Sequence, residues 1–399
     1  MKKKIAIISE GHYASTIPLA KHLADCGCLV DYFLLRDHRP NVIEGANINV
    51  QKFLFGTKKI KHDDARELYD YVGSNGMWIY MSAIISLFEH IPVLKVFVKG
   101  NYWERRLLKR LEKGNYDGIN LVGRYNSIVI PRLIKKLPSD RMIVSLHEVC
   151  DHKNSNFSCI SDFMSYLFKD NVKIVVHSRK TYDDILNYEG CKKDRISVIP
   201  FGVFESYSVI KDCENSIIPS DYILMVGLIT SYKGIDVLYK ALSKVPDLKG
   251  YKVVIAGDGW VPVIDKIKDD DRFVYIPGYL SNELFVSLIK NCRFIVCPYL
   301  SMSQSGIPQS AYLFDKPILA SDLDGFHGIV VDKVTGLLST AGNADELAEN
   351  IKLMINDDSL IDRLSERIRI FKRTSPEYSW ESIVRKYLLL WDGKSCLDC

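Results

Sequence analysis

The residues best suited to chemistry lie between Tyr299 and Leu338, in the segment YLSMSQSGIPQSAYLFDKPILASDLDGFHGIVVDKVTGLL. Its Ser/Gly-rich loop, Ser303 to Gly306, directly precedes a helix-like run. Backbone N–H groups in the first turn of a helix are free to bind an anion, and hydroxyl groups beside them make a phosphate site that needs no metal. A plain helix N-cap is the alternative.

Two further glycine turns favour a ligand site. The segment YILMVGLITSYKGIDVLYKAL (222–242) contains an apolar strand, a turn at Gly227, a Lys-Gly pair and an amphipathic helix. The segment YKVVIAGDGW (251–260) is a β-rich run that stops at Gly-Asp-Gly. Three strands that end in glycine turns put three loops on one edge of a parallel sheet, which is where open α/β folds bind ligands.

The first half of the chain also begins with an apolar strand, a glycine and a helical pattern. The strand KKKIAIISEG (2–11) is followed by the helical pattern TIPLAKHLADCG and a second strand, LVDYFLL. This βαβ order predicts a doubly wound sheet. Gly11 and His12 follow the first strand, and His12 is either a ligand contact or an exposed loop histidine. RMIVSLHEVCDH (141–152) predicts a strand that ends in His147, Glu148 and, further on, His152.

These segments, taken together and in order, resemble the retaining nucleotide-sugar glycosyltransferases of the GT-B fold, in the large family four group. The resemblance is carried by VG…YKG, AGDG, IPGYL, PYLSMSQSG, KPILASDLDG and TGLL, and it covers the C-terminal half with a fainter match in the N-terminal half. It implies an α/β fold of two Rossmann-like, doubly wound domains that face each other across a cleft. We expect an acceptor domain at 1–200, a nucleotide-sugar domain at 201–375, and a final helix and tail at 376–399 that cross back to the first domain.

The implied reaction moves a hexosyl group from a nucleoside-diphosphate sugar to a glycan or lipid-linked acceptor, with retention at the anomeric carbon. Its barrier lies in separating an oxocarbenium-like sugar from a dianionic leaving group, so the enzyme must neutralise the diphosphate and position the acceptor hydroxyl. The resemblance makes His147 and Lys233 the catalytic candidates. The expected donor contacts are Gly227, Thr230, Lys233, Gly257, Tyr279, Leu280, Ser303, Gln304, Ser305, Gly306 and Ile307. The expected acceptor contacts are Gly11, His12, Arg124 and His152.

We expect neither a metal ion nor a cofactor. GT-B enzymes use cations and helix N-termini instead of a metal. Asp322 and Asp324 have the spacing of a metal-binding Asp-x-Asp motif, but they fall where relatives have an Asp-x-Gly-Gly turn. Asp269 to Asp271 lie in a polar loop. Neither group follows a strand in a way that requires a cation.

The chain departs from the family pattern at three places. Relatives carry an arginine just after the position of Gly227, where this chain has Leu228 and Thr230. Ser310 stands where a glutamate commonly holds the ribose, and the donor-sugar glutamate near Ser303 is absent. Asp324 and Gly328 replace the usual Gly and Glu of the next turn. A catalytically silent GT-B protein that binds nucleotide or glycan is therefore the second hypothesis, whereas a sugar-nucleotide epimerase lacks a suitable carboxylate pair.

The composition indicates the class of protein and the cellular compartment. The 399 residues are 47% hydrophobic and 26% charged, as in an ordinary soluble protein large enough for two domains. The N-terminal run lacks the cleavage site of a signal peptide, and ten irregularly spaced cysteines are typical of a reduced, cytoplasmic protein. Residues 1–200 contain 31 Lys and Arg against 22 Asp and Glu, a net charge of +9, so the first half is expected to meet anionic partners.

The sequence indicates whether that anionic partner is a nucleic acid or a membrane surface. No nucleic-acid recognition motif and no repeated basic-aromatic pattern is present, so nucleic acid is a poor candidate, and we expect no nucleic-acid partner. NYWERRLLKRLEKG (101–114) predicts a helix with one cationic and one apolar face, which can lie on an anionic membrane or be a core helix with a basic solvated face. Because many relatives work on lipid-linked acceptors, we expect membrane-surface contact through residues 95–113 at the inner membrane face.

Overall fold

The computed structural model describes residues 2–36, 56–61, 63, 65–73, 76–83, 105–123, 129–147, 164, 167–168, 172–213, 217–302 and 304–393. The chain divides into two compact units. Unit 1 contains residues 1–201 and 380–399, and unit 2 contains residues 202–379. The sequence had placed these boundaries after residues 200 and 375. Within the described part of the chain, every helix falls short of the length or apolarity that a membrane crossing needs.

Unit 1 is built on an eight-stranded sheet of order β3-β4-β2-β1-β5-β6-β7-β8, in which only β3 is antiparallel to its neighbour. Its strands are β1 (Lys4–Ser9), β2 (Leu29–Arg36), β3 (Gly56–Lys59), β4 (Met77–Ala83), β5 (Gly118–Gly123), β6 (Met142–Leu146), β7 (Lys173–Val176) and β8 (Ile196–Val198). Its described helices with assigned bounds are α1 (Tyr13–Asp25), α2 (Arg66–Val72), α4 (Val129–Lys136), α6 (Arg179–Ile185) and α13 (Trp380–Trp391), with 3-10 turns η3 (Ser139–Arg141) and η4 (Lys193–Arg195).

The strands of unit 1 are apolar on both faces because helices cover both. Alternate residues of β1 divide between two cores: Ile5 and Ile7 pack with α1, α2 and α13, whereas Ala6 and Ile8 pack with α4 and α6. Buried parallel strands read as continuous apolar runs for this reason. The chain order reverses between β1 and β5, so the loops after these two strands lie at the topological switch point of the sheet.

Unit 2 is built on a six-stranded parallel sheet of order β11-β10-β9-β12-β13-β14. Its strands are β9 (Tyr222–Val226), β10 (Lys252–Gly257), β11 (Phe273–Pro277), β12 (Ile295–Cys297), β13 (Ile318–Ser321) and β14 (Gly336–Ser339). Its helices are α7 (Ile235–Leu242), α8 (Val263–Lys268), α9 (Asn282–Asn291), α10 (Ile307–Leu313), α11 (Ala344–Asn356) and α12 (Asp358–Thr374), with 3-10 turns η5 (Glu205–Val209) and η6 (Ser231–Lys233). The switch point of this sheet lies between β9 and β12.

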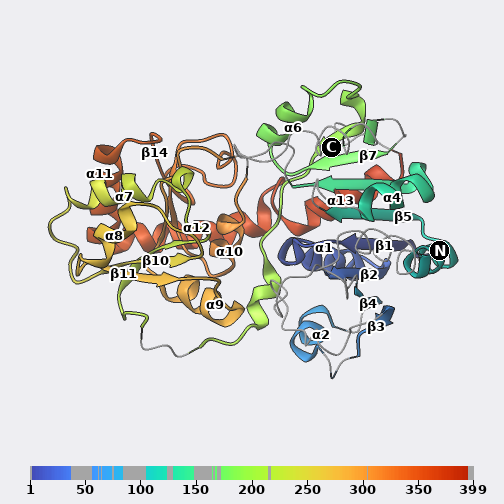
Figure 1. Cartoon of the computed structure of the whole chain (residues 1–399), viewed down its shortest axis with the longest axis horizontal. Helices are drawn as coiled ribbons and strands as arrows, with labels where there is room; N and C mark the ends of the chain where they lie inside the picture. Colours follow the sequence, from blue (N-terminus) through green and yellow to red (C-terminus); the bar gives the residue numbers. More distant parts are fainter. Residues whose placement is uncertain are drawn as a thin grey trace, which may run out of the picture. The chain divides into compact units, whose positions relative to one another are not determined.

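Two helical layers cover the unit 2 sheet. Helices α7, α8 and α11 pack on one core, and α9 and α10 pack on the other (Figure 1). The segment after the unit boundary forms η5 and buries Ser206, Tyr207 and Ile210. This segment is therefore a packed part of unit 2.

The C-terminal helix differs from the sequence prediction in where it begins. We expected the final helix to begin at residue 376, but α12 ends at Thr374 and α13 begins only at Trp380. Pro376 explains the break, because the residue before a proline avoids helical backbone angles, and Ser375 has φ −61° and ψ 125°. Helix α13 lies in unit 1, where Trp380, Ile383, Val384, Tyr387, Leu390 and Trp391 are buried.

The basic helix also differs from the membrane-facing arrangement that we expected. Residues 105–114 are helical, and Leu107, Leu108 and Leu111 are buried in the core of unit 1. The leucine face is thus occupied by the protein and cannot enter a bilayer. The basic side chains on the other face are exposed, and residues 95–104 lie outside the described residues.

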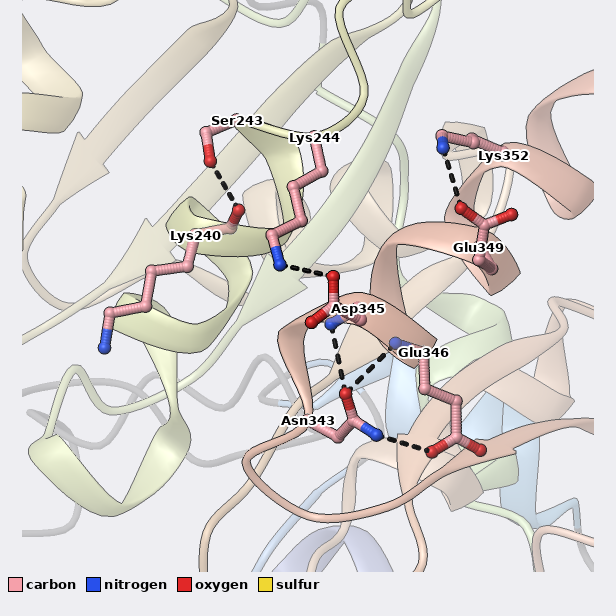
Figure 2. Close-up of polar contacts among 8 residues, drawn as sticks. All are labelled: Lys240, Ser243, Lys244, Asn343, Asp345, Glu346, Glu349 and Lys352. Carbon is pink, nitrogen blue, oxygen red and sulfur yellow. Dashed lines mark hydrogen bonds and ion pairs between the residues drawn. The ribbon is translucent and has the colours of Figure 1, made fainter.

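Helix α11 begins with a polar cap that joins it to its surroundings (Figure 2). Asn343 Oδ1 accepts hydrogen bonds from the backbone N–H groups of Asp345 at 3.1 Å and Glu346 at 3.2 Å. Glu346 Oε2 in turn accepts from the N–H of Thr340 at 2.8 Å. Lys244, just after α7, pairs with Asp345. The cap satisfies N–H groups that a helix start otherwise leaves without partners.

We therefore predict that Asn343→Ala lowers the stability of the protein by about 1 kcal/mol, because the N-cap acceptor is lost. The melting temperature should fall by about 2–4 °C, as measured by differential scanning fluorimetry. Asn343→Asp keeps an acceptor at the cap and is the matched control. An equal loss in both variants would contradict the capping role.

Candidate functional site

Three loops of unit 2 are locked together at the carboxyl edge of its sheet. Gly227 follows β9 with φ 119°, and a Cβ atom on Gly257 would lie 1.8 Å from the Gly227 carbonyl oxygen. The Gly278 N–H donates to the Gly257 carbonyl at 3.0 Å. Only glycine allows this backbone approach at Gly257, which has φ 150°. The structure thus brings Gly227, Gly257 and the Tyr279-Leu280 turn, which are all expected donor contacts, to one edge of the sheet.

The loop after β9 is held against the end of β12. Gly234 has φ 68°, and a Cβ atom there would lie 1.9 Å from the carbonyl oxygen of Pro298. The Leu300 N–H donates to the Tyr232 carbonyl at 2.7 Å. These two contacts fix Thr230 and η6, and with them Lys233, at the switch point of the sheet.

Lys233 is the buried cation of this loop, with 8% of its surface exposed. Its Nζ lies 3.8 Å from the centroid of the Tyr299 ring and 5.2 Å from that of Tyr232. Burial lowers the pKa of Lys233 to about 8, because a charge is costly to remove from water. The site can therefore offer a positive charge near neutral pH.

The remaining donor candidates surround the start of α10. Gly306 is the residue before the helix, and a Cβ atom there would lie 2.8 Å from the Phe204 ring. The Ile307 N–H donates to Ser305 Oγ at 3.3 Å, and Gln304 is half-buried. Ser303 lies outside the described residues. The loop therefore brings Ser305, Gly306 and Ile307 together as predicted, but with the Ile307 N–H already engaged by a side chain.

The positions that depart from the family pattern do not supply replacement charges. Leu228 is exposed to 61%, and the Ser310 hydroxyl donates to the Gly306 carbonyl of its own helix at 3.0 Å. A backbone-bonded serine on a buried helical face cannot replace a carboxylate that binds a ribose. Tyr279 is exposed to 65%, so its ring lies open at the edge of the sheet.

The acidic turn after β13 is an exposed cluster of polar side chains. His327 Nε2 lies 2.5 Å from Asp322 Oδ1, and its Nδ1 lies 3.5 Å from Asp324 Oδ1. All three side chains are more than half exposed. Among the described residues, no group of three or more His, Cys, Asp or Glu side chains has an arrangement that could hold a metal ion. Metal independence stays a prediction.

Unit 1 carries a second cluster at the edge of its own sheet. Gly11 and His12 both have left-handed backbone angles, with φ 87° and 55°. The His12 ring stacks on His147, which follows β6, with centroids 3.4 Å apart. Phe201 lies 4.7 Å from His147 and 3.9 Å from His177. The structure thus brings the two predicted histidines together, whereas Arg124, Glu148 and His152 lie outside the described residues.

His177 was missed by the sequence analysis, although it follows β7 just as His147 follows β6. Its Nδ1 donates to the Ile199 carbonyl at 2.7 Å, and burial lowers its pKa to about 4. His177 is therefore neutral at physiological pH, and its Nε2 is an acceptor. The strand-end signal that selected His147 could have selected His177 as well.

A pocket of about 290 Å³, including its open mouth, lies beside these histidines. Asn120 and Ser145 line it from β5 and β6, and Tyr387 lines it from α13. Ser145 Oγ donates to Asn120 Oδ1 at 2.9 Å and lies 3.2 Å from the Tyr387 hydroxyl. The pocket therefore combines a polar wall with the apolar side chains of Leu19, Val122 and Ile383.

Comparison with solved structures identifies the fold. Sucrose-phosphate synthase from Thermosynechococcus elongatus has the same fold, with a TM-score of 0.67 and 17% identity over 98% of this chain and 99% of that one. Anabaena HepE, solved with UDP and glucose, aligns with a TM-score of 0.63 and 14% identity over 98% of this chain and 100% of that one. The chain has the two-domain α/β GT-B fold predicted from the sequence.

Sequence comparison supports the family that the sequence resembles. Residues 220–357 match the model of glycosyl transferases group 1. Uncharacterized glycosyltransferase MJ1607 of Methanocaldococcus jannaschii is 21% identical over 88% of this chain and 94% of its own length.

Two other relatives match over shorter stretches. MJ1178 of Methanocaldococcus jannaschii is 28% identical over 40% of this chain and 45% of its own length. The capsular polysaccharide biosynthesis glycosyltransferase CapM of Staphylococcus aureus is 23% identical over 54% of this chain and 60% of its own length. In these two pairs the chain spans less than two thirds of the relative.

We predict that Gly234→Ala destabilises the protein by more than about 2 kcal/mol, because the new Cβ atom meets the Pro298 carbonyl in a left-handed backbone conformation. Gly250→Ala is the matched control, since Gly250 has φ 85° but nothing within 4 Å of its Cβ position. Thermal unfolding measures both. Equal losses would show that the approach to Pro298 is not what requires glycine at 234.

Proposed function

We propose that this protein is a retaining glycosyltransferase that moves a sugar from a nucleoside-diphosphate sugar to a glycan or lipid-linked acceptor in the synthesis of a cell-surface polysaccharide. The observation that carries the proposal is the buried Lys233 at the switch point of unit 2. Support comes from the match to glycosyl transferases group 1, from CapM and from the UDP in the HepE structure.

Unit 2 would hold the donor. Lys233 would neutralise the diphosphate as the bond to the sugar breaks, and Ser305, Gly306 and Ile307 would border the phosphates at the start of α10. The exposed Tyr279-Leu280 turn would border the base. No metal ion is needed in this proposal, because the lysine supplies the positive charge.

Unit 1 would hold the acceptor. The His12 and His147 rings lie at the carboxyl edge of the sheet, where an imidazole can donate to or accept from a sugar hydroxyl. The neighbouring His177 is neutral, so it adds no positive charge beside a reacting oxocarbenium-like centre. Retention is tested by proton NMR of the first product, and an inverted anomeric configuration would contradict it.

The binding half of the proposal predicts a selective rise in melting temperature with one nucleoside diphosphate or its sugar, because a ligand that binds only the native state stabilises it. A panel of nucleotides is titrated against the wild-type protein and Lys233→Ala, and the rise should be lost in the variant. The outcome that would contradict the proposal is a melting temperature of the wild-type protein that no nucleotide raises. The hypothesis of a catalytically silent partner protein would then replace the enzyme proposal. The leucine at position 228, where relatives have an arginine, favours that hypothesis.

The same titration should depend on pH. With a Lys233 pKa of about 8, the lysine is mostly protonated at pH 7 and mostly neutral at pH 9. The affinity for the diphosphate should therefore fall about tenfold as pH rises from 7 to 9. Lys233→Arg keeps its charge over this range and is the matched control. A pH-independent wild-type affinity would contradict the role of Lys233.

We also propose that unit 1 meets the inner face of an anionic membrane through the exposed basic side chains of residues 105–113, without insertion of the leucines. Replacing Arg105, Arg106, Lys109 and Lys113 by Gln should weaken binding to vesicles that contain phosphatidylglycerol at least tenfold, since each basic residue near such a surface contributes about 1 kcal/mol. Four exposed lysines of unit 2, Lys240, Lys266, Lys268 and Lys333, are replaced as the control. Equal binding of both variants to the vesicles in a sedimentation assay would contradict the proposal.

A further inference from the structure

Lys233 is a buried cation without a buried counter-charge. Among the described residues, no Asp or Glu carboxylate forms an ion pair with its ammonium group. Buried charges are costly unless they are paired, and pairs of this kind are the usual solution in proteins. Something other than a carboxylate must therefore hold this ammonium group in place.

Two aromatic rings occupy the place of a carboxylate. The Lys233 Nζ lies 3.8 Å from the Tyr299 ring centroid and 5.2 Å from the Tyr232 ring centroid. The two rings are 6.3 Å apart and nearly perpendicular, at 84°. An aromatic face attracts a cation through its quadrupole, and the attraction is stronger where water is excluded. The ammonium group thus lies in a corner formed by two rings.

The Tyr299 ring is fixed by its position in the fold. Tyr299 is 1% exposed and belongs to one of the two cores of unit 2. Its ring packs on Phe326, with centroids 5.3 Å apart, and the next residue, Leu300, bonds the Tyr232 carbonyl. Tyr299 therefore belongs to the rigid end of β12, whereas Lys233 belongs to the loop after β9.

Two titratable groups that face Lys233 from the end of β12, Cys297 and Tyr299, are neutral. Cys297 lies on β12, and burial raises the pKa of its thiol to about 11. Burial also raises the pKa of the Tyr299 hydroxyl well above its usual value. Neither group carries a negative charge near pH 7, so neither one competes with an anionic ligand for the ammonium group.

We propose that Tyr299 is a positioning residue for the donor diphosphate: its ring face holds the Lys233 ammonium group at the switch point without neutralising it. A carboxylate in the same place would occupy the N–H donors and cancel the charge. A ring does neither, so the donors stay available for phosphate oxygens. The role in donor binding rests on the proposed function, but the hold of Tyr299 on Lys233 does not.

The hold is tested by NMR of protein labelled with ¹³C-lysine, in which the Lys233 signal is assigned by its absence in Lys233→Arg. Removing the ring in Tyr299→Leu should lower the titration midpoint of Lys233 by about one pH unit or more, which is a tenfold drop in the ratio of protonated to neutral lysine at a given pH. Tyr299→Phe keeps the ring and should stay within about 0.3 pH units of wild type.

Controls separate the ring from general packing. Phe294→Leu removes a buried ring from the other core of unit 2, and it should leave the midpoint unchanged. Tyr299→Met fills more of the space than leucine, and it replaces Tyr299→Leu should that variant not fold. An unchanged midpoint in the ringless variant, or an equal shift in Tyr299→Phe or Phe294→Leu, would overturn the proposal.

Donor binding supplies the second readout. With the nucleoside diphosphate that the wild-type protein binds, Tyr299→Leu should lose about tenfold in affinity at pH 7.5, whereas Tyr299→Phe should lose less than about twofold. If the wild-type protein binds no nucleotide, the proposed function fails, and the lysine titration still decides whether Tyr299 holds Lys233. An unchanged affinity in the leucine variant would refute the positioning role.

Discussion

The proposed donor site depends on the close approach of Gly234 to the Pro298 carbonyl. A Cβ atom at position 234 would come within 1.9 Å of that oxygen, so only glycine lets the loop after β9 reach the end of β12. The approach sets Lys233 over the Tyr299 ring and joins the two strands between which the chain order of the sheet reverses. Parallel topology opens a gap between loops at such a point, and the glycine contact decides which side chains border it.

The two units use the carboxyl edges of their sheets differently. Unit 2 presents a buried cation among neutral aromatic rings and a thiol, which suits an anionic ligand. Unit 1 presents stacked rings, with a neutral His177 behind them and a pocket walled by Asn120 and Ser145. This second set can exchange hydrogen bonds with hydroxyl groups. A transferase that neutralises a diphosphate and orients a hydroxyl acceptor requires this division of chemistry.

Much of this arrangement could be predicted from the sequence because it depends on local signals. Apolar strands that end in glycine predicted parallel sheets and the edge that carries Gly227, Lys233 and Gly257. The GT-B fold was implied by the resemblance to a known family. The sequence could not show that Leu107, Leu108 and Leu111 pack inside unit 1, since an amphipathic helix reads the same against a core and against a membrane. Tyr299 escaped notice because its importance lies in contacts between residues far apart in the chain, and such contacts leave no local pattern. His177 follows its strand as His147 does, and that local signal was overlooked.

A crystal structure of the protein with the nucleoside diphosphate that stabilises it would test the central claim most directly. We predict that Lys233 Nζ lies about 3 Å from a phosphate oxygen, at hydrogen-bond distance, and remains over the Tyr299 ring. A diphosphate bound away from the loop after β9, or a Lys233 side chain turned away from both the ligand and Tyr299, would contradict the account.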